Sequence, residues 1–398
     1  MNHLFYIFYQ HLDRISTEVV RYLYTRINLD NRLIAITGAR GCGKTTFILQ
    51  HVKMNFEQYP KDVLYASCDH IWFASNSIYD LADEFRKKGG KVLLLDEIHK
   101  YQNWSREIKN IYDDFPDLKV IFTGSSMLEI YKVKADLSRR AAVYYMNGLS
   151  FREFIQLEYS IEIPQISLSD IIQNHVTIAM QFCKLLKPIP AFAEYLKMGY
   201  YPFYKEDKLM YHEKLLNTLN VVLESDLPAV EKIDYYSVVK IRKLFSIISS
   251  LVPFKPNISR LSTDLDITRK SLLNYLYFLK KAQAILLLEK DALGISQLVK
   301  PEKIYLNNTN YIFALGGENA NMGNIRETFF FNQVEVNHKV TWSDKTDFVV
   351  DCKYSFEIGG KNKTNKQLKD VSDGYLALDN IEVGFDRQIP LWMFGLMY

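Results

Sequence analysis

Short hydrophobic runs alternate with longer amphipathic stretches along the first 150 residues of the chain. Four of these runs occupy residues 33–36, 63–66, 92–95 and 120–122, and a polar residue follows each of them. Runs of this length are typical of buried strands, while the stretches between them have the spacing of helices. Strands that alternate with helices predict a parallel sheet with helices on both faces. Residues 1–30, ahead of the first run, are predicted to be helical.

The pattern changes after about residue 150, where the hydrophobic runs stop. Helical spacing continues to about residue 283, broken at Pro253 and Pro256. Short strands follow, and the last 75 or so residues have the pattern of strands joined by turns. We therefore predict an α/β chain whose parallel sheet is followed by helices and by a smaller α+β domain. The expected bounds of its five parts are 1–30, 31–150, 151–235, 236–300 and 301–398.

Composition and charge narrow the class of protein. The 398 residues are 48% hydrophobic and 24% charged, with a formal net charge of +3, which excludes a disordered or collagen-like chain. The four cysteines are far apart and form no C-x-x-C pair, which argues against a zinc site or a disulfide framework. No apolar stretch approaches the roughly 18 residues of a membrane span, and the N-terminus lacks a secretory-signal pattern. We predict a cytoplasmic protein without a membrane partner.

A glycine-rich motif follows the first hydrophobic run directly. Its sequence is Gly38-Ala39-Arg40-Gly41-Cys42-Gly43-Lys44-Thr45, which fits the phosphate-loop pattern G-x-x-x-x-G-K-[ST] at every fixed position. Such glycines let backbone N–H groups point inward around phosphate oxygens, and the helix that starts near Thr46 adds its dipole. Lys44 is expected to reach the β- and γ-phosphates, and the Thr45 hydroxyl to bind Mg²⁺. We therefore predict that residues 38–46 bind a nucleotide.

Further candidates for this site follow the third and fourth runs. Asp96 is expected to hold the Mg²⁺ shell, and Glu97 to orient or deprotonate the water that attacks the γ-phosphate. Thr123 is equally consistent with a contact to the γ-phosphate or with an ordinary turn. Arg139 or Arg140 could stabilise transition-state charge, within the chain or across a subunit interface. The alternative for both arginines is a structural ion pair or a solvated basic surface.

Together these motifs resemble P-loop ATPases of the AAA+ class over roughly residues 31–235. The stretches Leu149-Ser150-Phe151-Arg152-Glu153-Phe154 and Gly199-Tyr200-Tyr201-Pro202 make the chain similar to a widespread prokaryotic ATPase family. Members of that family carry a C-terminal domain related to restriction endonucleases, and their L-S-F-x-E-F stretch opens a helical lid. The resemblance implies ATP and Mg²⁺ as cofactors. The lack of an N-K-x-D motif also favours ATP over GTP, and the long continuation beyond the lid disfavours a small-molecule kinase.

A basic segment follows the predicted lid. Residues 236–300 contain 11 Lys and Arg against 4 Asp and Glu, a net charge of +7, so the rest of the chain is net acidic at −4. Thr268 is a plausible N-cap for a helix that reaches residue 281, and two strands after it would form a wing. Arg269, Lys270 and Asn274 would then face outward, toward double-stranded DNA. The alternative is a helical module that packs on a neighbour or contacts a protein.

The C-terminal domain contains acids suited to a second site. Asp347 and Glu357 are predicted on neighbouring strands, where they could hold a divalent ion, with Glu327 as a further carboxylate. Lys361 could stabilise charge on a phosphate, and Gln367 could add a polar contact. This resembles the restriction-endonuclease-like core, summarised as D followed by E-x-K. However, three residues separate the acid at 357 from the lysine at 361, where the usual spacing is one.

Two functions remain open at this point. The first is an ATP-binding and ATP-hydrolysing AAA+ protein with a DNA-contacting winged helix and a nuclease-like C-terminal domain. The second is a nucleotide-gated switch whose C-terminal domain docks a protein and cleaves nothing. Its motivation is the unusual spacing of the C-terminal acid and lysine. In either case ATP and ADP are the expected ligands, and a homo-oligomer or a protein partner is consistent with both.

Overall fold

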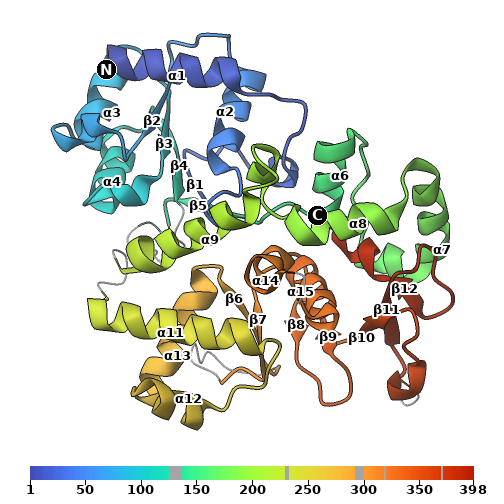
Figure 1. Ribbon diagram of the computed structural model, residues 1–398. Coiled ribbons are helices and arrows are strands. Elements are labelled where there is room, and N and C mark those ends of the chain that lie inside the picture. Colours follow the sequence, from blue (N-terminus) through green and yellow to red (C-terminus); the bar gives the residue numbers. More distant parts are fainter. Residues whose placement is uncertain (125–136, 138, 229–232, 292–299, 318–319, 369–370) are drawn as a thin grey trace. The chain divides into compact units, whose positions relative to one another are not determined.

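The structure is a computed structural model, which describes residues 1–398 except 125–136, 138, 229–232, 292–299, 318–319 and 369–370 (Figure 1). The chain forms two compact units, Met1–Asn147 and Gly148–Tyr398. Each unit has a sheet and helices of its own. The predicted α/β class is confirmed, with a parallel sheet in the first unit and a mixed sheet in the second.

The sheet of the first unit has five parallel strands. They are β1 (Leu33–Gly38), β2 (Val63–Ser67), β3 (Val92–Asp96), β4 (Lys119–Gly124) and β5 (Ala142–Met146), in the order β2-β3-β4-β1-β5. The four predicted runs are β1 to β4. Strand β5 lies at the sheet edge, and only its last residue is buried, although its sequence Ala-Val-Tyr-Tyr-Met is a hydrophobic run like those of the other strands.

Helices cover both faces of this sheet. Figure 1 shows α2 (Lys44–Asn55) on one side, and α3 (Ile78–Lys87) and α4 (Trp104–Asp114) on the other. Helix α1 (Asn2–Arg14) packs on β2 and α2. The predicted helix over residues 1–30 is therefore too long, since α1 ends at Arg14 and only a short 3₁₀ turn, Tyr22–Thr25, follows it.

The second unit opens with helices, as the sequence predicts. They are α6 (Phe151–Tyr159), α7 (Leu168–Leu185), α8 (Pro188–Met198) and α9 (Tyr211–Val221), the last continued by a π-helical turn, Val222–Asp226. Helix α6 begins with a capping box, because Ser150 accepts from the Glu153 N–H while the Glu153 carboxylate accepts from the Ser150 N–H. This pair explains the polar positions of the L-S-F-x-E-F stretch.

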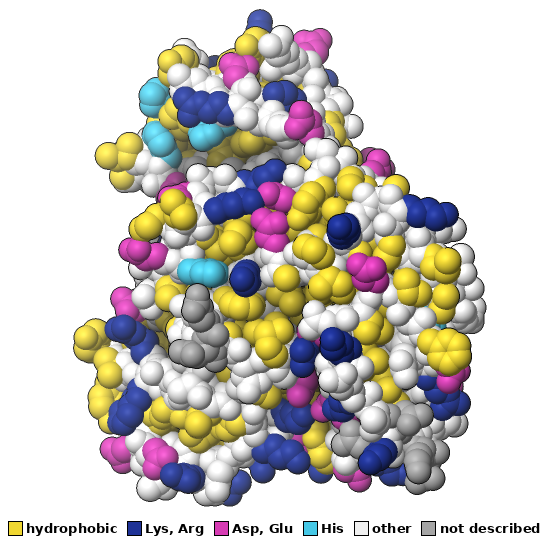
Figure 2. Space-filling model, turned by 45° about the vertical axis from the view of Figure 1, so that its right-hand side comes forward, with side chains coloured by type: hydrophobic (Ala, Val, Ile, Leu, Met, Phe, Trp, Pro, Cys, Tyr) yellow, Lys and Arg dark blue, Asp and Glu magenta, His cyan; other side chains and the backbone are white. Residues whose placement is uncertain are grey.

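The basic segment contains three helices and one strand, β6 (Ile285–Leu288), which pairs with β7 (Lys303–Leu306) just beyond the segment. Helices α11 (Tyr235–Leu251), α12 (Ile258–Leu265) and α13 (Arg269–Lys281) precede these antiparallel strands. The Thr268 side chain caps α13 by accepting from the Ser271 N–H. On the face drawn in Figure 2, basic and acidic side chains are interspersed over the surface.

The C-terminal part contains the mixed sheet. Helices α14 (Thr309–Gly316) and α15 (Met322–Val334) precede five strands: β8 (Val340–Thr341), β9 (Phe348–Val350), β10 (Tyr354–Gly360), β11 (Gly374–Asp379) and β12 (Gln388–Pro390). Strands β10, β11 and β12 are parallel to one another, whereas β8, β9 and β10 are antiparallel. Helix α15 packs on β10, so Glu327 of α15 lies near the strands that carry the predicted acids.

The last described residues return to the start of the second unit. The Ser150 hydroxyl and the Arg152 guanidinium both donate to the Tyr398 backbone oxygen, over 2.7 and 2.8 Å. The side chain of Tyr398 is fully buried. Residues 148–152 and 391–398 therefore belong to one hydrophobic core. Among the described residues, no helix is long and apolar enough to cross a membrane.

Candidate nucleotide site

The phosphate loop joins β1, a central strand of the sheet, to α2. Gly41 and Gly43 adopt left-handed backbone conformations, with φ of 82° and 97°, which residues with a Cβ adopt only at a cost. Gly38 has a different reason to be glycine, because a Cβ there would lie 2.2 Å from the carbonyl oxygen of Met146 on β5. The loop conformation therefore depends on glycine at these three positions.

Two side chains of the motif have different hydrogen-bond partners. The ammonium group of Lys44, which is 4% exposed, donates to the carbonyl oxygens of Gly38 and Ala39 over 3.0 and 2.9 Å. It therefore lies against the backbone at the start of the loop. The Thr45 hydroxyl instead donates to Asp96 Oδ2 over 2.6 Å. This hydrogen bond joins the start of α2 to the end of β3.

The Asp96 carboxylate is buried and receives three hydroxyl donors. Besides Thr45, the Tyr65 hydroxyl donates to Oδ2 over 2.9 Å, and the Thr123 hydroxyl donates to Oδ1. These donors offset the cost of removing a carboxylate from water, since Asp96 is 3% exposed. Burial and the nearby Asp96 charge raise the pKa of Tyr65 well above its usual value. Tyr65 therefore remains a hydrogen-bond donor throughout the physiological pH range.

Glu97 follows Asp96 with an unusual backbone. Its φ and ψ are 50° and 40°, a left-handed conformation that strains a residue other than glycine and is common at functional sites. Its N–H donates to Thr123 Oγ1 over 3.1 Å, and its Oε2 lies 3.4 Å from His99 Nε2. Thr123 is thus placed between the two acids. The structure brings together Thr45, Asp96, Glu97 and Thr123, four of the predicted residues.

The two candidate arginines have different surroundings. Arg140 forms a two-pronged ion pair with Asp113 at the end of α4, with N–O distances of 2.9 and 3.0 Å. The Arg140 guanidinium lowers the pKa of the Asp113 carboxyl. Arg139 is exposed, and no described residue forms an ion pair with it. The ion-pair alternative therefore describes Arg140, while Arg139 keeps an exposed charge.

Three residues at this site escaped the sequence analysis. Arg21 is 7% exposed and donates to the backbone oxygens of Cys42 in the loop and of Asn147, the latter over 2.7 Å. Nothing in the sequence distinguishes it from a surface arginine. Tyr65 was missed because it lies inside a hydrophobic run. His99 carried a usable signal, because it lies two residues after Glu97 at the end of a strand.

The C-terminal acids form a second cluster, built with two lysines. The Asp347 N–H donates to Glu357 Oε2 over 3.2 Å, and Asp347 Oδ2 accepts from the Ile358 N–H over 2.9 Å. Lys303 of β7 lies 3.2 Å from Glu327 Oε2 and 3.5 Å from Asp347 Oδ1. The predicted acids Glu327, Asp347 and Glu357 therefore come together.

The lysine that contacts these acids from the β10 side is Lys363. Its ammonium forms an ion pair with Glu357 and lies 3.8 Å from Asp347 Oδ2. The predicted Lys361 is exposed in the turn after β10. Burial raises the pKa of Glu357 although Lys363 acts in the opposite direction. The Gln367 side chain lies outside the described part of the structure.

This cluster contains the acids that were predicted to hold a divalent ion. In the described part of the chain, no group of three or more His, Cys, Asp or Glu side chains is arranged to hold a metal ion. At the C-terminal cluster the two ammonium groups of Lys303 and Lys363 lie between the carboxylates instead. The three acids are thus partly neutralised by side chains of the same chain.

Comparisons with known proteins identify the first unit. Residues 30–155 match the AAA_14 family model, described as an AAA domain. This domain implies ATP binding, usually with Mg²⁺, and ATPase chemistry. The match ends soon after residue 150, and the C-terminal domain is not identified. No curated protein matches the chain.

Solved structures match over part of their own length. Katanin, in a structure of its self-assembly, is 17% identical over 40% of this chain and 57% of its own, with a TM-score of 0.26. PCH-2 from C. elegans is 18% identical over 44% and 48%, with a TM-score of 0.25. The Hsp104–ADP complex from S. cerevisiae is 16% identical over 69% and 44%, with a TM-score of 0.30. The chain thus spans about half the length of these proteins.

Proposed function

We propose that the first unit binds ATP with Mg²⁺ and hydrolyses it. The observation that carries this proposal is the hydrogen bond between Thr45 and Asp96, with Thr123 on the other carboxylate oxygen. Hydroxyl and carboxylate oxygens are the ligands that Mg²⁺ prefers, so Thr45 and Asp96 would hold the ion. Bound Mg²⁺ neutralises negative charge on the phosphates. Lys44 would move from its carbonyl partners to the β- and γ-phosphate oxygens.

Glu97 and Thr123 would prepare the attacking water. The Thr123 hydroxyl donates to Asp96 and accepts from the Glu97 N–H; a contact with the γ-phosphate or the water would require this hydroxyl to exchange one of these partners. The Glu97 carboxylate would accept the water proton, with His99 beside it to orient the carboxylate. The left-handed backbone of Glu97 sets the direction in which this side chain leaves the strand end.

A phosphate-release assay tests this proposal. Lys44→Ala and Glu97→Gln should each abolish turnover, while Glu97→Gln should retain binding of a fluorescent ATP analogue. The matched controls are Lys88→Ala and Glu84→Gln, which change an exposed ion pair on α3 and should hydrolyse ATP at the wild-type rate. Wild-type turnover no faster than that of Lys44→Ala would refute hydrolysis. Analogue binding by Lys44→Ala as tight as that of the wild type would refute the binding site.

We propose a DNA contact for residues 236–300. The order of three helices followed by β6, which pairs with β7 just beyond residue 300, and the net charge of +7 over residues 236–300 support it. In this arrangement α13 would offer Arg269, Lys270 and Asn274 to a major groove. Binding to a duplex should weaken steeply as salt rises, because lysine and arginine displace counterions from the phosphates.

The C-terminal domain has two candidate roles, of which the ion-paired acids favour the second. Metal-assisted cleavage of DNA needs carboxylates that are open to a cation, whereas Lys303 and Lys363 occupy that space. A domain that docks a partner, under control of the nucleotide, needs no such opening. Incubating the protein with plasmid DNA and Mg²⁺ or Mn²⁺ distinguishes the cleavage role from the docking role. Cleavage by the wild type that is lost in Asp347→Ala and Glu357→Ala would reject the docking role.

A further inference from the structure

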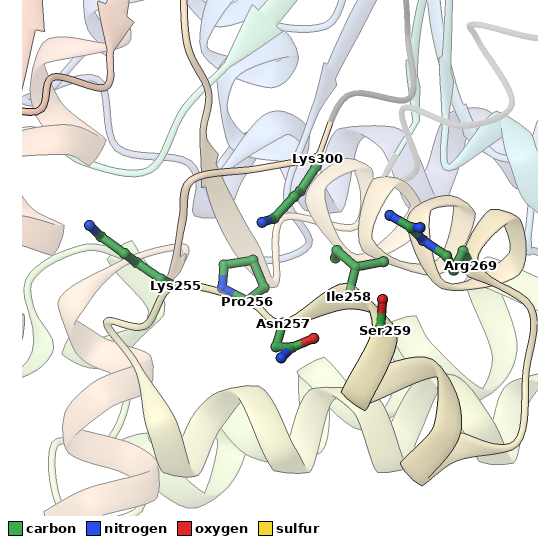
Figure 3. Close-up of a pocket in the computed structure, with 7 residues that line it drawn as sticks. All are labelled: Lys255, Pro256, Asn257, Ile258, Ser259, Arg269 and Lys300. Atoms are coloured by element: carbon green, nitrogen blue, oxygen red, sulfur yellow. The ribbon is translucent and has the colours of Figure 1, made fainter.

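A pocket of about 290 Å³ lies where α12 and α13 begin (Figure 3). Three basic side chains line it, and each comes from a different segment. Lys255 precedes α12, Arg269 is the first residue of α13, and Lys300 precedes β7. Figure 3 shows Lys255 and Arg269 on either side of the first turn of α12 and Lys300 above it. The fold therefore gathers positive charge at one point.

These three cations differ from others of the same module. Arg260, Lys280 and Lys290 each lie within 4 Å of an acidic side chain, with N–O distances of 3.7, 3.8 and 3.5 Å. By contrast, no described residue forms an ion pair with any of the three cations that line the pocket. Lys255 contacts the Trp342 ring, at 5.7 Å from its centre. Lys255, Arg269 and Lys300 thus keep their positive charges at the pocket, with no acidic partner among the described residues.

The floor of the pocket adds uncharged donors. Asn257 caps α12 by accepting from the Arg260 N–H over 3.0 Å. The N–H groups of Ile258 and Ser259 lie in the first turn, where a helix has no internal partners for them. The Ser259 hydroxyl also lines the pocket. Cations, backbone N–H groups and a hydroxyl are the donors that proteins use for a phosphate group.

We propose that this pocket binds a backbone phosphate of double-stranded DNA. The inference rests on the DNA contact proposed for this module. The pocket suits a polymer better than a free nucleotide, because its lining has no aromatic side chain for a base and its polar side chains are exposed. Helix α13 starts at the pocket, so a phosphate held there would place Lys270 and Asn274 along the adjoining groove.

A titration of a 20-base-pair duplex by fluorescence anisotropy tests the proposal. We expect Lys255→Ala/Lys300→Ala to raise Kd about tenfold for unrelated sequences alike, because phosphate contacts carry no sequence information. The slope of log K against log salt should fall by about 1 for each phosphate that the variant no longer binds. Lys214→Ala, which removes an exposed lysine from α9, is the matched control and should bind like the wild type. Circular dichroism melting checks that each variant is folded.

The other outcomes distinguish a failure of the pocket proposal from a failure of the proposed DNA contact. Wild-type binding that Lys270→Ala/Asn274→Ala weakens and Lys255→Ala/Lys300→Ala does not would overturn the pocket alone. A wild type that binds no duplex at 50 mM KCl would overturn both proposals. If 5 mM inorganic phosphate displaces the duplex completely, the pocket is a site for free phosphate and the proposal fails. Binding to phosphatidylserine vesicles that only the pocket variant loses would assign it to a lipid surface and also overturn the proposal.

Discussion

Tyr65 and Asp96 lie on the neighbouring strands β2 and β3, and the tyrosine hydroxyl donates to the aspartate over 2.9 Å. Removing this donor in Tyr65→Phe keeps the ring, which stacks on Phe8 with 6.2 Å between ring centres. We expect ATP turnover at limiting Mg²⁺ to fall about fivefold, as the loss of about 1 kcal/mol of net hydrogen bonding predicts. The readout is the Mg²⁺ concentration that gives half-maximal turnover.

A purely structural role for Tyr65 would give a different result. In that case the melting temperature would fall while the Mg²⁺ dependence stayed unchanged. Tyr22→Phe is a suitable control, because it also removes a tyrosine hydroxyl from the first unit, one that contacts the backbone of Asn147 over 3.3 Å. The control should leave the Mg²⁺ dependence at the wild-type value.

Substitutions of Arg139 and Arg140 should have different effects on ATP turnover. Arg139→Ala should lower kcat about a thousandfold if this exposed cation stabilises transition-state charge, with ATP affinity retained. Arg140→Ala should keep wild-type turnover and lose less than about 1 kcal/mol of stability, since its partner Asp113 is partly exposed. Turnover assays and urea unfolding measure the two effects. Equal turnover in both variants would show that Arg139 does not stabilise transition-state charge.

Lys363 and Lys361 should differ in their effect on stability. Lys363→Ala leaves the Glu357 side chain, which is 4% exposed, without its ammonium partner, and we expect it to cost about 1–3 kcal/mol in urea unfolding. Lys361→Ala removes an exposed lysine two residues away and should cost almost nothing. The double variant Glu357→Gln/Lys363→Met should recover part of the loss, because it buries no unpaired charge. No recovery would mean that Lys363 stabilises the domain through packing.

His51 predicts a pH dependence of stability. Burial, followed by the charge of Lys119, lowers its pKa from 6.5 to about 4. The unfolded chain therefore binds a proton that the folded chain does not between these values. The stability that this difference contributes is complete above pH 6.5 and is lost as pH falls toward 4. Urea unfolding at pH 7.5, 6 and 5 should show a smaller decline for His51→Gln than for the wild type.

The sequence predicted the parts of the fold that have a simple periodic signal. Strands β1 to β4 and the capped helix α13 were found because hydrophobic runs and the cap at Thr268 are local. Strand β5 was missed although residues 142–146 form a hydrophobic run. Helix α1 was predicted too long because helical spacing gives a poor indication of a helix end.

Site residues that belong to local motifs could likewise be predicted from the sequence. The phosphate loop and Asp96 are set by short motifs, so the sequence could assign both to one site, whereas for Thr123 it left a phosphate contact and an ordinary turn equally open. The contact of Glu357 with Lys363 could not be predicted, because it depends on how the turn after β10 folds back. Arg21 and Lys303 were equally hidden, since each reaches its partners from a distant segment.

The bonds between Ser150, Arg152 and Tyr398 impose an order on events during synthesis. Ser150 and Tyr398 are 248 positions apart in the chain, so the core that they share cannot close until residue 398 has left the ribosome. The first unit ends at Asn147 and can fold while the remainder is still being translated. Until then, residues 391–398 cannot cover the hydrophobic face of α6. During this interval, the exposed hydrophobic surface makes the nascent chain prone to aggregation.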